Sequence, residues 1–430
     1  MTKDHRSSTV VRWTTALLVL GVALGIHTLN DFAALDIYWP PTAVDTAVEA
    51  HFSETYYQAR ALFRQRAKAA NAKLVELPVP HLSHLDLSVD VAVFHGTQEE
   101  LLVHVSGTHG VEGFAGSAIQ SKILEQAPTW GSTGPSVVLI HALNAFGFAQ
   151  LRRFNEHNVD LNRNWLSKGE FKERISMSPN AFGYEDVYDA LNPSAHASWS
   201  ESYWVRAVYH LLTKGFAKIK RAVVTGNHHF PASIFYGGIE KQPSLAIVEE
   251  CLETHIDFSK VRRLAVIDVH TGLGKSGDDT LMLTKLNNRT AANEIFPAEM
   301  ASGKAVPMND ASNPVVRGYD AVGGYVADGI ASLGPSEARH STIAMAQEFG
   351  TVPGIFVLKA VSEENAHFHQ APTRRLPFAE KLRDVFYVHR SVSWKTTVLA
   401  RGVAVFERLR QAFSSSPGAS SPAQSADAAP

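Results

Sequence analysis

Two spacings of apolar residues alternate along this chain, and together they predict an α/β protein. Apolar positions recur every three or four residues in 53–75 and 201–219, as in helices with one buried face. Residues 85–94 and 100–107 instead alternate apolar and polar positions, as in strands, and residues 95–100, HGTQEE, are predicted to form the turn between them. Further helices are predicted at 116–126, 243–256 and 392–413.

Three runs of mainly apolar residues predict buried strands at 135–144, 262–274 and 342–351. Because strands and helices alternate, we expect a single domain with a mostly parallel, mixed central sheet flanked by helices. Ligands of such sheets bind at the carboxyl ends of the strands. The residues at those ends are therefore the first candidates for chemistry.

Both ends of the chain depart from this pattern. Three basic residues precede the apolar run 16–26, so residues 1–34 are predicted to be a signal peptide or signal anchor. The protein is then expected to be exported, as a periplasmic protein or one attached to the membrane and facing outward, with a cytoplasmic location as the alternative. Residues 415–430 are rich in Ser, Pro and Ala and are predicted to be a disordered tail. The folded domain is expected to span 43–414.

Composition limits the kinds of site that the chain can build. The formal net charge of −2 gives no reason to expect nucleic acid, whose binders usually carry a basic surface. Cys251 is the only cysteine, which excludes an intrachain disulfide and a cysteine-based metal site. With 20 histidines in the chain, imidazole and carboxylate groups are the expected metal ligands.

The turn after the strand at 100–107 carries His109 and Glu112 in the stretch VSGTHGVEGFAGSA. This Gly-rich turn could cradle a phosphate, but it has neither the dinucleotide-binding spacing nor the Gly-Lys-Ser/Thr ending of a nucleotide loop. A metal site explains the two residues better. His270, at the end of another predicted strand, would supply a third ligand and leave a position open for water. Asp268, two residues earlier on the same face, could orient that imidazole.

Two further strand ends supply a carboxylate and positive charge. Glu348 follows the apolar run TIAMAQ and is the best candidate for a base that takes a proton from a metal-bound water. The loop RRFNEHNVDLNRNW contains Arg163, which suits bidentate binding of a carboxylate, and Arg153, which could stabilise an oxyanion. Taken singly, Glu348 could equally be a surface residue, and each arginine a solvated one.

The order of these motifs resembles a known family. H-x-x-E at 109–112, R-x-N at 153–155, VDLNRNW at 159–165, a later strand-end His and a final Glu are similar to the zinc carboxypeptidases and to their relatives, the succinylglutamate desuccinylase and aspartoacylase group. The stretches SGTHGVEGFAGSAIQ, FYGG, DVHTGLG and QEFGT look like a bacterial branch of that superfamily whose function is not established. The resemblance covers roughly residues 53–400 and implies a zinc carboxypeptidase-like fold.

The resemblance also implies a role for each matching residue. It assigns one Zn²⁺ ion to His109, Glu112 and His270, the general base to Glu348, the oxyanion to Arg153, and substrate contacts to Asn162, Arg163 and Tyr325. Tyr236, in FYGG, is an alternative to Tyr325, and either could be a packed aromatic. The neighbouring His228 and His229, in GNHHFP, compete as third ligand. His270 is preferred because it ends a strongly apolar strand.

These residues predict a zinc-dependent hydrolase that cleaves an amide bond next to a free carboxylate. A metallocarboxypeptidase acting on a small peptide is the leading prediction, and a deacylase acting on an N-acyl amino acid is the alternative. A non-catalytic ligand-binding protein on the same fold is the second class. A serine hydrolase lacks support, since no G-x-S-x-G motif occurs.

Overall fold

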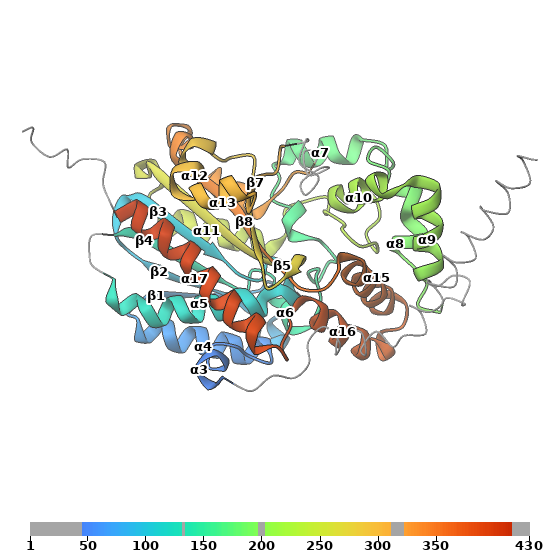
Figure 1. The fold of residues 1–430 in the computed structure, drawn as a ribbon, viewed down its shortest axis with the longest axis horizontal. Helices are drawn as coiled ribbons and strands as arrows, with labels where there is room; N and C mark the ends of the chain where they lie inside the picture. The colour runs from blue at the N-terminus through green and yellow to red at the C-terminus, as the bar shows by residue number, and fades with distance from the viewer. Residues whose placement is uncertain (1–44, 131–133, 197–202, 311–321, 415–430) are drawn as a thin grey trace, which may run out of the picture.

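The protein is built around one mixed β-sheet covered by helices on both faces (Figure 1). The structure is a computed structural model, and it describes residues 45–130, 134–196, 203–310 and 322–414. Within these residues the sheet has eight strands in the order β1-β2-β4-β3-β5-β8-β6-β7. The strands are β1 (Lys73–Pro78), β2 (Ser88–Phe94), β3 (Thr97–Val105), β4 (Pro135–His141), β5 (Arg263–Ser276), β6 (Asp279–Leu283), β7 (Ala305–Pro307) and β8 (Thr342–Gly350).

The middle of the sheet is parallel and its edges are partly antiparallel. Strand β3 pairs in parallel with both β4 and β5, and β5 pairs in parallel with β8. The pairs β1–β2, β2–β4 and β6–β8 are antiparallel. Every residue of β4 and β8 is buried, as expected for strands covered on both faces. The predicted mostly parallel, mixed sheet in a single α/β domain is therefore confirmed.

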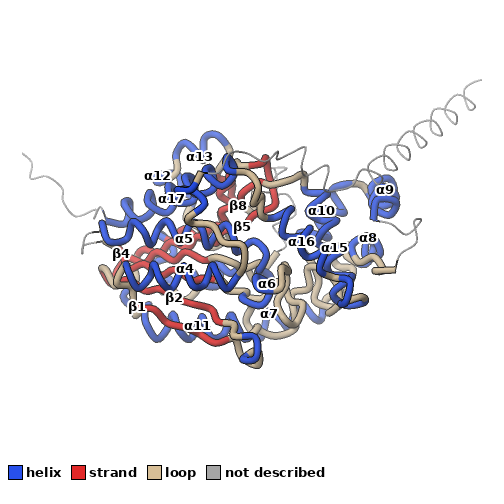
Figure 2. Tube along the Cα trace, turned by 90° about the horizontal axis from the view of Figure 1, so that it is seen from below, coloured by secondary structure: helices blue, strands red, loops and turns tan. Residues whose placement is uncertain are grey.

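Helices pack on both faces of this sheet. Helices α4, α5 and α17 cover one face and α11 the other, as the two views agree (Figures 1 and 2). The helices described are α3 (Thr46–Glu49), α4 (Tyr56–Ala69), α5 (Gly113–Gln126), α6 (Ala145–Ala149), α7 (Lys168–Ser176), α8 (Tyr188–Leu191), α9 (Tyr203–Lys214), α10 (Phe216–Thr225), α11 (Pro243–His255), α12 (Arg289–Ile295), α13 (Pro297–Ser302), α14 (Val326–Ala331), α15 (Gly354–Gln370), α16 (Leu376–Phe386) and α17 (Val392–Ser414).

Three local predictions were wrong. The helix predicted at 53–75 ends at Ala69, and Lys73 already begins β1, an edge strand that alternates too weakly to separate from the helical pattern. Residues 97–100 belong to β3 rather than to a turn, and β4 lies between β2 and β3, so the two strands form no hairpin. The helix predicted at 201–219 breaks at Gly215, where φ is +79°, into α9 and α10.

The predicted signal segment at 1–34 and the predicted tail at 415–430 lie outside the described residues. Among the helices of the described part, none is both long and apolar enough to cross a membrane. Strands β3, β5 and β8 lie side by side, and their carboxyl ends define the edge where the candidate side chains meet.

Candidate metal centre

The turn after β3 is shaped by a close approach of the backbone. His109 has an extended conformation, and the single 3₁₀ turn Gly110–Glu112 follows it and leads into α5. A Cβ atom on Gly110 would lie 2.1 Å from the carbonyl carbon of Gly147 in α6, so no other residue fits there. The Gly-rich composition of this turn therefore lets α6 pack directly against the residues that carry His109 and Glu112.

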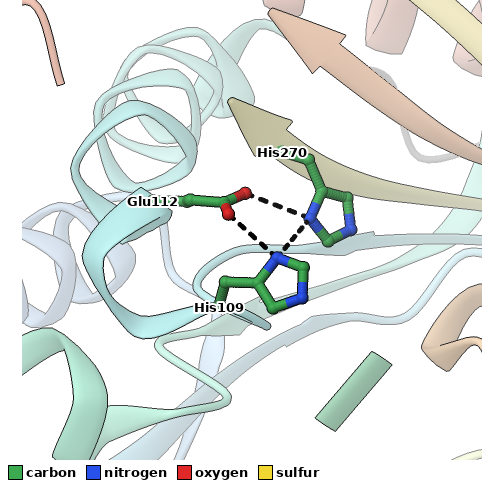
Figure 3. A group of neighbouring side chains, drawn as sticks. All are labelled: His109, Glu112 and His270. Carbon is green, nitrogen blue, oxygen red and sulfur yellow. Dashed lines mark hydrogen bonds and ion pairs between the residues drawn. The ribbon is translucent and has the colours of Figure 1, made fainter. Parts of the chain in front are cut away.

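Three buried side chains converge at this turn (Figure 3). Nδ1 of His109 lies 2.9 Å from Oε1 of Glu112. Nδ1 of His270, which comes from β5, lies 3.1 Å from Nδ1 of His109 and 3.2 Å from Oε2 of Glu112. Two imidazole nitrogens and a carboxylate thus face one another, and together they could hold a metal ion.

Each of the two imidazoles contacts a buried carboxylate through Nε2, the ring nitrogen that does not face the cluster. Nε2 of His109 lies 3.0 Å from Oδ1 of Asp160, and Nε2 of His270 lies 2.9 Å from Oδ2 of Asp268. Such carboxylate–histidine pairs fix the tautomer of a ligating histidine and turn its other nitrogen toward the metal. Asp268 is itself held, since the hydroxyl of Thr108 donates to its Oδ1 at 2.8 Å.

The charged groups of the cluster stabilise one another: carboxylates favour the protonated form of His270, and nearby cations favour the ionised form of Glu112. Burial opposes the charged form of His270, but Asp268 and Glu112 outweigh it and raise the pKa of this imidazole well above its ordinary value. Burial likewise works against ionised Glu112, yet His109, His270 and Arg153 lower the pKa of this carboxyl. A buried carboxylate that is held ionised in this way is suited to binding a cation.

Glu348 lies directly opposite His270 in the parallel pairing of β8 with β5. Its side chain is nearly buried, and its Oε1 accepts a hydrogen bond from the backbone N–H of Leu273 at 3.0 Å. Burial and the negative charge of Glu112 raise the pKa of this carboxyl to about 7. The carboxylate therefore adjoins the cluster without being one of its three donors.

The predicted arginines reach the site in two different ways. Nη1 of Arg153 donates to Oε1 of Glu112 at 2.8 Å, and its Nη2 lies 2.8 Å from Nε2 of His109. Arg163 instead pairs with Asp160 and donates to the backbone carbonyl of Val224 at 2.8 Å. Arg153 therefore borders the cluster, whereas the guanidinium of Arg163 is engaged by groups of the protein itself.

Asn162 and the two tyrosines occupy supporting positions. Oδ1 of Asn162 accepts from the backbone N–H of Val326 at 3.0 Å, and its Nδ2 lies 3.5 Å from Nε2 of His270. Tyr325 is buried in an apolar cluster on the sheet, and the carbonyl of Tyr236 accepts from the N–H of Asp160 at 2.7 Å. The described geometry thus places Asn162 nearest the donors.

The two competing histidines do not join the cluster. Nδ1 of His228 lies 2.7 Å from the carbonyl oxygen of Gly238, which accounts for its burial, and neither His228 nor His229 belongs to the donor group. The histidine preferred from the sequence, His270, is the one that lies in the group with His109 and Glu112.

The sequence analysis missed Asp160. Asp160 contacts Nε2 of His109 and pairs with both Arg153 and Arg163. It therefore connects the loop of residues 152–165 to the turn of residues 109–112 (the metal turn). A signal for it was present, because Asp160 lies within the same VDLNRNW motif that supplied Asn162 and Arg163.

The chain belongs to a family described as protein of unknown function (DUF2817), whose model matches residues 52–401. A comparison with curated protein sequences gives no match.

Several solved structures of hydrolases are similar to the chain. Bovine thrombin-activatable fibrinolysis inhibitor, solved with tick carboxypeptidase inhibitor, is 11% identical with a TM-score of 0.40, over 78% of this chain and 98% of that one. A metallo-carboxypeptidase from Pseudomonas aeruginosa, in complex with (2-guanidinoethylmercapto)succinic acid, is 11% identical with a TM-score of 0.35, over 80% and 68%. A Shewanella frigidimarina NCIMB 400 protein, provisionally described as a succinylglutamate desuccinylase/aspartoacylase, is 14% identical with a TM-score of 0.30, over 70% and 72%.

These neighbours include members of both groups that the sequence motifs resemble. Because the TM-score of each of the three structures lies below 0.5, we derive neither a fold nor an activity of this protein from them.

Proposed function

We propose that the protein is a zinc-dependent hydrolase that cleaves an amide bond next to a free carboxylate, and that it acts as a metallocarboxypeptidase. One observation carries this proposal: two buried imidazoles and a carboxylate face one another, and each imidazole is backed by a second carboxylate. A histidine that merely stabilises a core needs no such matched pair of partners. A metal ligand does.

The donor set fits zinc. Zn²⁺ takes imidazole nitrogen and carboxylate oxygen at about 2.0–2.2 Å in a tetrahedral arrangement, which puts two ligand atoms roughly 3.3–3.6 Å apart. The three separations between donors, 2.9, 3.1 and 3.2 Å, need to widen only slightly to match. Three protein ligands would leave a fourth position for water, as in catalytic zinc sites.

The surrounding residues supply the rest of a hydrolytic mechanism. Zinc held by His109, Glu112 and His270 would polarise the scissile carbonyl and acidify a bound water. Glu348, adjacent to His270 across the strands, would accept a proton from the attacking water on its carboxylate and pass it to the leaving amine. Arg153, at the edge of the cluster, donates to the oxyanion that develops on the substrate.

Binding of the substrate's carboxylate falls to Asn162 and Arg163 in this proposal, with Tyr325 as a further contact. Arg163 is paired with Asp160 in the structure, so a substrate carboxylate would have to share or replace that partner. The substrate is a small peptide with a free C-terminus. An N-acyl amino acid presents the same amide and carboxylate, so a deacylase is the second candidate, since the same donors would serve both.

An export route accompanies this function in the proposal. We propose that residues 1–34 direct the protein across the membrane, where peptides with free C-termini are available. Fractionation of the native host, followed by N-terminal sequencing, tests this. Recovery only in the cytoplasm with Met1 retained would contradict it.

The first experiment is elemental analysis of the purified chain beside His109→Ala and His270→Ala. We expect about one zinc per wild-type chain and loss of zinc in both variants, because each removes one of three donors. Wild-type protein that stays free of metal after zinc is supplied would support the alternative of a non-catalytic binding protein.

The second experiment separates the two enzymatic candidates. The zinc-loaded chain is assayed with N-benzoylglycyl-phenylalanine, whose last peptide bond precedes a free carboxylate and is a carboxypeptidase target. It is also assayed with N-acetylaspartate and N-succinylglutamate as deacylase targets. Release of phenylalanine alone supports the metallocarboxypeptidase. Release of aspartate or glutamate alone replaces it with the deacylase.

A further inference from the structure

A buried ion pair lies behind the metal turn, and the proposed chemistry does not use it. Arg152 is fully buried, and its Nε donates to Oε1 of Glu364, in α15, at 3.1 Å. Nη2 of Arg152 donates to Oδ1 of Asn158 and to Oδ1 of Asn365, both at 2.9 Å. The guanidinium carbon also lies 3.3 Å from the ring centroid of Phe368.

Keeping two opposite charges in a protein interior is costly. Removing an arginine and a glutamate from water carries a desolvation penalty that their mutual attraction does not always offset, and apolar residues often replace such pairs without loss of stability. Glu364 also accepts a hydrogen bond from Nη1 of Arg375, at the start of α16, at 2.9 Å. The carboxylate therefore joins two arginines at a site where an apolar contact could have served.

The main chain of the loop that carries Arg152 is hydrogen-bonded to the metal turn. The carbonyl of Arg152 accepts a hydrogen bond from the N–H of Val111 at 2.8 Å, and that of Arg153 accepts from the N–H of Gly110 at 3.2 Å. Gly110 and Val111 are the two residues between His109 and Glu112. A displacement of Arg152 would therefore move both donors that this turn supplies.

We propose that Arg152, held by Glu364 and Asn365 of α15, is the positioning residue that sets the separation of His109 and Glu112. The buried pair fixes the loop, the loop's carbonyls fix the two amides of the turn, and the turn presents its donors toward His270. This inference rests on the proposed function for its metal, but the ordering of the turn is a property of the chain alone.

Glu364→Gln tests this role, because glutamine keeps the size of the side chain and removes its charge. Glu299→Gln is the matched control: Glu299, in α13, is also buried and also accepts from two arginines, Arg401 and Arg408. It is not among the partners of the metal turn. Two quantities are measured on the full chain: hydrogen exchange of peptides spanning residues 107–114 in metal-free protein, and zinc affinity by competition with a chelator.

We expect Glu364→Gln to speed exchange at residues 107–114 and to weaken zinc binding by about 10–100-fold, the range found when a ligand's supporting partners are removed. Glu299→Gln should change neither, even where its midpoint of thermal unfolding falls as far. Equal zinc affinity and equal exchange in the two variants would overturn the positioning role, as would an increase in exchange spread evenly over the chain.

Two further outcomes are separable. If wild-type protein binds no zinc, the proposed function fails, while the exchange measurement still decides whether Arg152 orders the turn. If Glu364→Gln does not fold, Asn365→Ala replaces it, because this change removes only one of the bonds to Arg152. It should show the same two effects, smaller in size, and their absence in a folded Asn365→Ala protein would overturn the inference.

Discussion

At the scale of single residues, each of the three candidate metal donors is held by a hydrogen bond to a group outside the cluster. Oε2 of Glu112 accepts from the backbone N–H of Thr271 at 3.0 Å, and each imidazole is held by its own aspartate. Side chains locked in this way do not have to be ordered by the metal, so less of the binding free energy is lost to conformational entropy. The site is preorganised by its hydrogen bonds.

Glu348→Gln should separate metal binding from turnover. Glutamine keeps the size of the side chain but cannot take a proton from water, so zinc content should stay at the wild-type level while kcat falls by about 10²–10⁴-fold. Elemental analysis and the rate of phenylalanine release from N-benzoylglycyl-phenylalanine check the two halves. Turnover within a factor of about 3 of wild type would show that another residue is the base.

Asp268→Asn should weaken zinc binding while leaving all three ligands in place. The amide can still accept from the imidazole of His270, but it no longer balances the charge, and we expect zinc affinity to fall by about 10–100-fold. Chelator competition measures it. Asp279→Asn is the control, since Asp279 is a buried aspartate bonded to Arg401 and Gln347 and to none of the three candidate donors. An equal loss of affinity in the control would point to a general loss of structure.

His109, Glu112, Asp268 and His270 could be named from the sequence because the continuous apolar runs of the predicted strands stop near them. The backbone carbonyls of Val223 and Val224, which accept from Arg163, could not be named in this way, since they lie about sixty residues further along the chain. Contacts of this kind follow from tertiary packing and leave no local pattern.

At the scale of elements, β5 supplies His270 and also holds the side chains of Glu112 and Glu348. It continues for six residues beyond His270, and the pairing with β8 shifts between Thr271 and Ser276. The irregular stretch turns the N–H of Thr271 toward Glu112 and that of Leu273 toward Glu348. The distortion of one strand thus orients both a metal donor and the candidate base.

Gly272→Ala should therefore harm both stability and activity. Gly272 has a φ of +122°, and a Cβ there would lie 2.7 Å from the buried ring of Phe386. We expect unfolding to become easier by about 1–3 kcal/mol, with a fall in kcat. Gly277→Ala is the control, because Gly277 also has a positive φ, +80°, but no atom within 4 Å of the added methyl.

The control should lose about 1 kcal/mol and retain its kcat, since only backbone strain is added. Urea unfolding and the same peptidase assay measure both quantities. Identical losses of stability and of kcat in the two variants would mean that neither the contact with Phe386 nor the backbone hydrogen bonds of Thr271 and Leu273 matter.

The order of the strands was the part of the fold that local patterns could not supply. Alternation predicted strands at 85–94 and 100–107, which overlap β2 and β3, but two strands joined by a short connection need not pair. Here β4 inserts between them and pairs with both. Which strand pairs with each edge of β3 depends on packing between residues that are far apart in the sequence.

At the scale of the whole molecule, the sheet interior contains histidines that have no part in the metal site. His104, in β3, and His141, at the end of β4, are fully buried, with Gln120 and Ser117 as their side-chain partners. Burial lowers the pKa of His104 to about 3, and it is the main reason that the pKa of His141 falls to about 4. The folded protein therefore holds both imidazoles neutral near pH 7.

These two histidines should make the fold sensitive to acid. In the unfolded chain their pKa values return to about 6.5, so between about pH 6.5 and pH 4 the unfolded state binds protons that the folded state refuses. Their contribution to stability is complete above the unfolded pKa and decreases as the pH falls, by up to about 1.4 kcal/mol per pH unit for each histidine. Acid should thus weaken the core through two groups that lie outside the candidate metal centre.

The prediction is tested by urea unfolding of metal-free protein between pH 6 and pH 5, for wild type and for His141→Gln. Other groups also titrate in this range, and Glu348 in particular, with its raised pKa, works in the opposite direction. The difference between the two slopes removes those common terms. We expect the slope of the variant to be smaller by about 1 kcal/mol per pH unit, since one proton fewer distinguishes its unfolded state. Parallel slopes would mean that His141 is already protonated in the folded protein, so that the negative charge of its cross-strand neighbour Asp90 outweighs the effect of burial.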